Sequence, residues 1–102
     1  MKLQEFYIVC NGGREKVTGR RQGKYFGIHG ERGRWTLTHL PSGYAIAYPF
    51  TLDECKRIVK GVMRLSIDWG QSNYDFFQKL PAEVKRQVGT AIRLALLPKR
   101  LR

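Results

Sequence analysis

The stretch from Trp35 to Leu52 (WTLTHLPSGYAIAYPFTL) constrains the fold more than any other, because it contains no Asp, Glu, Lys or Arg. Charged residues make up 26% of the whole chain. The length of the run suggests a membrane span, which needs about 20 apolar residues. Two prolines, a glycine, a histidine and three threonines interrupt the run and argue against a span. The stretch is therefore interpreted as a buried hairpin that leads into a helix.

Four segments of the chain have the composition of β-strands. Two lie inside the uncharged stretch, at Trp35–Leu40 and Tyr44–Tyr48, and the Pro-Ser-Gly sequence between them has turn chemistry. The other two are Leu3–Cys10 and Tyr25–His29. Leu3–Cys10 has apolar residues on both faces, so we expect it to be a central strand or to be covered on both sides.

A helix start follows the uncharged stretch. Thr51 is predicted to be the N-cap, Glu54 to complete a capping box, and Phe50 and Cys55 to form a hydrophobic staple. The basic residues of this helix are interpreted as a solvated face. The helices predicted in the chain are Leu52–Leu65, Tyr74–Lys79 and Pro81–Leu97. The two longer helices each contain a glycine, at Gly61 and Gly89, and we expect them to cross closely there.

These elements predict an α+β fold. An N-terminal antiparallel sheet of about four strands is expected, followed by three helices packed on one face. A chain of 102 residues with no repeat or linker is expected to form a single basic α+β domain over residues 1–102.

The charge balance gives the strongest indication of function. Nineteen Lys and Arg against eight Asp and Glu give a net charge of +11, divided almost equally between the two halves of the chain. A folded domain this basic usually binds a polyanion, most often nucleic acid. The alternative is that the charge only aids solubility.

Residues 14–24 (REKVTGRRQGK) concentrate this charge and are expected to form a flexible or hairpin-tip loop. Arginine forks and glycine backbone could hold phosphates there, although a solvated turn would have the same composition. Tyr44 and Tyr48 could form an aromatic row beside the loop, but the pattern favours core positions for both rings. The candidate nucleic-acid-binding residues are Arg14, Lys16, Arg20, Arg21, Lys24, Arg32, Arg34, Tyr44 and Tyr48.

Other classes of site have little support. Cys10 and Cys55 lack metal-ligand or redox spacing, so no metal site is predicted; two buried, reduced thiols are expected, and a disulfide between them stays open. No cofactor motif is present, and no cofactor is expected. The N-terminus lacks the apolar run of a signal peptide, so a cytoplasmic location and no membrane partner are expected. The oligomeric state stays open.

One segment resembles a known family. The segment Arg34–Lys56 (RWTLTHLPSGYAIAYPFTLDECK) resembles the end of the AP2-like and phage-integrase arm-binding domains, three-stranded DNA-binding domains. In those domains an aromatic-led strand, a glycine turn and a second strand lead into a helix start of the same type. The resemblance implies a sheet face inserted into the DNA major groove.

Three functions therefore stand as hypotheses. The first is a non-enzymatic nucleic-acid-binding domain that contacts the phosphate backbone through the basic loop and the sheet edge. The second is a small phage-type inhibitor or adaptor, for example an anti-CRISPR-like antagonist, that docks on an acidic protein surface or on a host nucleoprotein complex. The third, least supported, is a small ribonuclease with His39 as general base.

Overall fold

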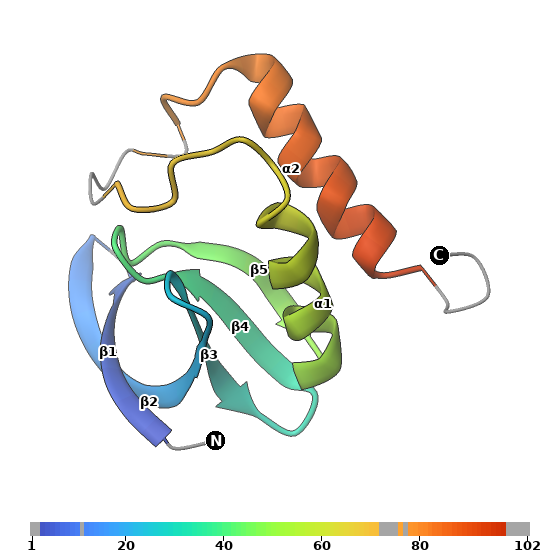
Figure 1. The fold of residues 1–102 in the computed structure, drawn as a ribbon. Coiled ribbons are helices and arrows are strands. Elements are labelled where there is room, and N and C mark those ends of the chain that lie inside the picture. Colours follow the sequence, from blue (N-terminus) through green and yellow to red (C-terminus); the bar gives the residue numbers. More distant parts are fainter. Residues whose placement is uncertain (1–2, 11, 72–75, 77, 98–102) are drawn as a thin grey trace.

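The computed structural model describes residues 3–10, 12–71, 76 and 78–97, and its secondary structure is a five-stranded antiparallel sheet with two helices (Figure 1). In chain order the elements are β1 (Leu3–Cys10), β2 (Gly13–Gln22), β3 (Phe26–Glu31), β4 (Arg34–His39), β5 (Ala45–Phe50), α1 (Leu52–Val62) and α2 (Ala82–Ala95). The strands lie side by side in the order in which they follow along the chain.

Short turns produce this strand order. Arg32 and Gly33 connect β3 to β4 with φ values of +38° and +80°, the positive pair that a two-residue hairpin turn requires. Glycine adopts this conformation without strain, and the register pairs Glu31 with Arg34 directly across the turn. The Pro-Ser-Gly turn between β4 and β5 forms as the sequence predicts, with φ +81° at Gly43.

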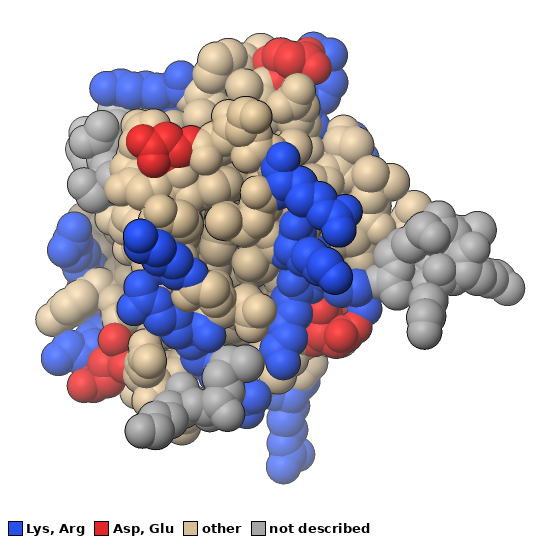
Figure 2. Space-filling model, in the orientation of Figure 1, with Lys and Arg blue, Asp and Glu red and all other residues tan. Residues whose placement is uncertain are grey.

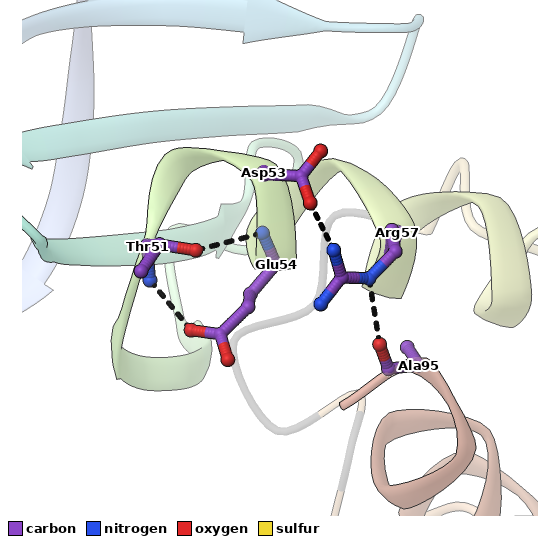
Figure 3. Close-up of polar contacts among 5 residues, drawn as sticks. All are labelled: Thr51, Asp53, Glu54, Arg57 and Ala95. Carbon is purple, nitrogen blue, oxygen red and sulfur yellow. Dashed lines mark hydrogen bonds and ion pairs between the residues drawn. The ribbon is translucent and has the colours of Figure 1, made fainter. Parts of the chain in front are cut away.

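Helix α1 begins where the sequence predicts. The hydroxyl of Thr51 accepts a hydrogen bond from the backbone N–H of Glu54 (3.1 Å), and the Thr51 N–H donates to the Glu54 carboxylate (2.8 Å; Figure 3). The capping box is thereby confirmed. The helix ends at Val62 rather than Leu65, because Arg64 and Leu65 form tighter three-residue bonds to Gly61 and Val62.

The core lies between α1 and one face of β3 and β4. Phe26, Ile28 and Leu37 are fully buried on the sheet, and Cys55, Ile58 and Val62 are fully buried on α1. The connection after α1 crosses the same face, where Trp69 and Phe76 lie against Phe26 and His39. Alternation along β3 and β4 presents these residues to the helix, because Phe26 pairs with His39 and Ile28 with Leu37.

The α+β fold and the N-terminal antiparallel sheet are as expected, but the expected three helices on one face are wrong, because the described residues form two helices and the sheet has five strands rather than about four. Residues 14–24, assigned to a loop, supply most of a fifth strand, β2. The extensive contacts of α2 are with α1, so α2 forms a layer outside the helix that covers the sheet (Figure 1). The predicted helix Tyr74–Lys79 lies partly outside the described residues, and Phe76, Gln78 and Lys79 within it are in turns.

The β1–β2 hairpin curls over the sheet face opposite α1. The ring of Phe6 approaches Gly27 so closely that a Cβ on Gly27 would lie 2.8 Å from it. The Val9 N–H donates to the Gly43 carbonyl oxygen (2.7 Å), which ties the hairpin to the β4–β5 turn. β1 is therefore an edge strand and not a central one, and its outer face, including Leu3 and Tyr7, is exposed.

The two glycines at the predicted helix crossing differ. Gly61 faces Ala91 of α2, with its carbonyl oxygen 3.6 Å and its Cβ 3.7 Å from a Cβ built on the glycine. A Cβ on Gly89 would meet only the Arg93 side chain of the same helix. The close crossing is therefore confirmed at Gly61 and wrong at Gly89.

Candidate nucleic-acid interface

Three predicted contact residues, Arg14, Lys16 and Arg20, lie on one face of β2. Their even spacing places them on the same side of the strand, because successive side chains alternate and the rise is about 3.3 Å per residue. This is the outer face of the curled hairpin. Arg14 and Lys16 are exposed and Arg20 is half-buried. The strand therefore presents a line of cations, an arrangement that a loop over residues 14–24 would not have predicted.

Aromatic rings hold two of these cations. Tyr7 of β1 pairs directly with Lys16, whose ammonium nitrogen lies 5.6 Å from the centre of the Tyr7 ring. The Arg20 guanidinium carbon lies 5.8 Å from the Trp35 ring centre. The Arg20 Nε is buried and has no hydrogen-bond partner among the described residues. Tyr7 keeps 51% of its surface exposed, so the face offers an aromatic ring beside cations.

One carboxylate shares this face. Glu5 of β1 pairs with Thr18, between Lys16 and Arg20 along the strand, and forms no ion pair within the part of the chain that the structure describes. Glu15 belongs to the opposite face by alternation. The hairpin's outer face therefore carries three cations and one anion among its described strand residues.

The remaining predicted residues lie elsewhere. Arg21 is on the opposite face of β2 from Arg20 and donates to the backbone carbonyl oxygen of Lys24 (2.7 Å). Lys24 lies in the β2–β3 turn, with its nitrogen 5.6 Å from the Tyr25 ring centre. The structure therefore separates these two residues from the line of cations on β2.

Arg32 and Arg34 lie at the β3–β4 hairpin. Arg34 donates to the hydroxyl of Tyr48 on β5 (3.2 Å), and this bond raises the pKa of Arg34 above its ordinary value. Tyr48 is 57% exposed, whereas Tyr44 is half-buried and precedes β5. The two tyrosines therefore do not form an exposed aromatic row.

His39 occupies a structural position. It is fully buried, its Nε2–H donates to the Trp69 carbonyl oxygen (2.6 Å), and its Nδ1 pairs with the Ser42 hydroxyl (2.8 Å). Burial lowers the pKa of His39, although the hydrogen bond to Trp69 opposes that shift. A buried ring with both nitrogens engaged cannot reach a substrate, which argues against the role of general base that the ribonuclease hypothesis needs.

His29 and the cysteines offer no stronger catalytic arrangement. His29 is half-buried against the Phe6 ring, and burial lowers its pKa. Cys10 and Cys55 are both free; Cys10 is exposed, contrary to expectation, and Cys55 is buried. Burial raises the pKa of Cys55 to about 11, so its thiol stays protonated at neutral pH.

A second basic region, along α1, was not identified from the sequence. Figure 2 shows Lys and Arg side chains in a column over α1. Arg57, Lys60 and Arg64 of this helix, together with Arg86 of α2, line an open cleft of about 1100 Å³ between the two helices. The available signal was the spacing of Arg57, Lys60 and Arg64, which places them on one side of a helix.

Two further properties concern metals and membranes. Across the described residues, no group of three or more His, Cys, Asp or Glu side chains is arranged to hold a metal ion. None of the helices in the described part of the chain is long and apolar enough to cross a membrane.

Comparison of the chain with family models, with curated proteins and with solved structures gives no match.

Proposed function

We propose that this protein is a non-enzymatic nucleic-acid-binding domain that holds the phosphate backbone on the outer face of its β1–β2 hairpin. The observation that carries the proposal is the line of Arg14, Lys16 and Arg20 on one strand face, beside an exposed aromatic ring. A net charge of +11 supplies the long-range attraction for a polyanion.

The chemistry of the face suits a phosphate backbone better than base edges. Cations spaced along a strand neutralise phosphates and position the nucleic acid without reading its sequence. Tyr7 adds a ring on which a base of a single strand could stack. A cytoplasmic location stays a prediction.

The proposal uses a different surface from the one that the AP2-like resemblance implies. That resemblance implies a sheet face inserted into the major groove, and α1 covers one face of this sheet, which leaves the face opposite α1 for such a role. Here Phe6 lies against Gly19 and Gly27 on that face, and Thr38 there is fully buried. The outer hairpin face is exposed and carries the cations, so we assign the phosphate contacts to it.

The test is the salt dependence of binding, measured by fluorescence anisotropy with duplex DNA, single-stranded DNA and structured RNA. Each lost phosphate contact should flatten the slope of log K against log salt by about 0.9 on duplex DNA or about 0.7 on a single strand. The Arg14→Ala/Lys16→Ala double variant should therefore flatten the slope by about 1.4–1.8. Thermal melts should be almost unchanged, since exposed charges contribute little to stability.

The matched control is Lys85→Ala/Arg93→Ala, which removes the same charge from exposed positions on α2. Its slope should stay close to that of the wild-type protein. An equal flattening in both variants would contradict the assignment to the hairpin face. A wild-type protein with no measurable affinity at low salt for any of the three nucleic acids would end the proposal.

A further inference from the structure

The cleft between α1 and α2 is distinct from the proposed nucleic-acid surface. It lies where Gly61 of α1 meets Ala91 of α2, and these small residues leave an open depression above the crossing. Helix α2 and the β1–β2 hairpin are on opposite sides of the molecule in Figure 1. A molecule bound in the cleft would therefore leave the hairpin's outer face free.

The floor of the cleft is apolar. Leu65, Ala91, Leu94 and Ala95 line it together with Gly61. Leu94 is not part of the hydrophobic core, and 56% of its surface is exposed. Transfer of exposed apolar surface out of water favours binding by about 25 cal/mol per Å². The floor therefore favours an occupant with apolar side chains.

The rims of the cleft are positively charged. Arg57 forms an ion pair with the Asp53 carboxylate and donates a hydrogen bond to the carbonyl oxygen of Ala95 (Figure 3). Arg86 forms an ion pair with Glu83, with 2.8 Å between Nη1 of the arginine and Oε2 of the glutamate. Lys60 and Arg64, both exposed, have no ion-pair partner among the residues that the structure describes. Two cations are thus available on the α1 rim beside an apolar floor.

We propose that this cleft binds an acidic amphipathic helix of a partner protein. Apolar residues spaced at i, i+3, i+4 and i+7 on such a helix would lie on the floor, and flanking carboxylates would pair with Lys60 and Arg64. The negative charge of the partner helix complements the positively charged rims, and its apolar stripe complements the apolar floor. Bound there, the partner would be joined to any nucleic acid held on the hairpin, which makes the protein an adaptor.

Three other occupants fit less well. The chain's own last residues, Lys99-Arg100-Leu101-Arg102, are basic and would be repelled by the rims. A second copy brings another net charge of +11. A nucleic acid would meet the rims through its phosphates but would leave Leu94 and the rest of the floor without an apolar partner.

The test uses a synthetic fluorescent peptide of about 15 residues, long enough to form a helix on binding. It has leucines along one helical face and glutamates elsewhere. A second peptide has the same composition with the leucines spread over all faces, so that charge is equal and only the apolar stripe is lost. Anisotropy titration of the full-length protein should show saturable binding of the first peptide. The affinity for the second peptide should be lower by a factor of about ten or more.

Two variants probe the cleft. Lys60→Glu/Arg64→Glu should weaken binding of the first peptide by about tenfold or more, through rim charges. Leu94→Glu should weaken it comparably through the floor. The control Lys85→Glu/Arg93→Glu makes the same charge change as the double rim variant on exposed parts of α2 outside the cleft, and should change affinity by less than about twofold. Circular dichroism and thermal melts of each variant verify that it folds.

Several results would overturn the proposal. They are the absence of saturable binding, equal affinity for the two peptides, equal losses in the rim and control variants, or displacement of the peptide by an RNA or DNA oligonucleotide that occupies the cleft. Failure of the nucleic-acid proposal is measured separately, because Arg14→Ala/Lys16→Ala should leave peptide affinity within about twofold of wild type. That variant and the rim variant therefore distinguish the two surfaces.

Discussion

Helices α1 and α2 have 11 and 14 residues and are both amphipathic, but the shorter one is much more deeply buried. Cys55, Ile58 and Val62 of α1 are fully inaccessible, whereas the most buried residues of α2, Val88 and Ala95, each keep 9% of their surface exposed. Helix α1 lies between the sheet and α2, and among the helices and strands that the structure describes α2 makes its extensive contacts with α1. An amphipathic pattern predicts that a helix packs against the rest of the protein, but not how much of its surface becomes buried.

The N-terminal capping of the two helices also favours α1 over α2 in stability. α1 has a complete capping box, and α2 begins after Pro81 without a side-chain cap hydrogen bond. A less buried, uncapped helix opens at lower free energy than one that is part of the core. We therefore expect two levels of stability, with α2 at the lower one.

Truncation of one buried residue in each helix tests this difference, and the largest effect is expected in α1. Ile58→Ala should reduce the free energy of unfolding by about 2–5 kcal/mol, because it leaves a cavity in a fully buried site. Val88→Ala should cost about 1.6 kcal/mol or less, and should lower hydrogen-exchange protection within α2 while the sheet stays protected. Urea titration and exchange measure the two effects. Equal losses, with loss of protection throughout the chain, would show that α2 belongs to the core unit.

Acidification should act on the sheet layer and spare α2, which contains no histidine. Burial lowers the pKa of both His39 and His29 from the ordinary value of 6.5. The unfolded chain therefore binds protons first, and stability that is complete above pH 6.5 is lost as the pH falls below it toward the folded-state pKa values. At about pH 5.5 the loss is at most about 1.4 kcal/mol for the fully buried His39.

The measurement is a series of urea titrations between about pH 8 and pH 5.5, above the range in which carboxylates titrate. His29→Gln serves as control, because the contribution of His39 should persist in it. A flat profile over this range would contradict the lowered pKa of His39.

Thr51→Ala tests the cap that distinguishes α1, and a smaller effect is expected. Loss of the hydroxyl that accepts from the Glu54 N–H should cost about 1 kcal/mol. Thr90→Ala is a matched control in α2, where the exposed threonine lies inside the helix and alanine is the better helix former. Chemical denaturation of both variants measures the difference. A loss in Thr90→Ala as large as that in Thr51→Ala would show that the cap has no special role.

Local chemistry was the part of the fold that the sequence predicted well. The capping box at Thr51 and Glu54, the turn at Gly43 and the strand Leu3–Cys10 each depend on residues close together in the chain. The edge position of β1 could not be predicted, because apolar residues on both faces are also typical of a central strand. The curl of β1 over the sheet could not be predicted either, because it brings Phe6 against Gly19 and Gly27, which belong to two other strands.

The candidate sites divide in a similar way. Arg14, Lys16 and Arg20 were selected by charge alone, and the glycines around them favoured a loop. Pairing with β1 makes the segment a strand and thereby places the three on one face, with Arg21 on the other. The cleft was missed because the charges of α1 look like a solvated face until α2 is placed beside them.

The order of the strands also has a consequence for how fast the chain folds. Every strand pairs with its neighbour in sequence, so the sheet grows from hairpins whose closing loops are short. Proteins dominated by such local contacts fold faster than those with distant pairings. The slower events are then the long-range closures, such as the bond from Val9 to Gly43 and that from His39 to Trp69, 30 residues apart. We expect the hairpins of β1 to β5 to form first, and the curl of the β1–β2 hairpin over the sheet and the docking of α2 to follow.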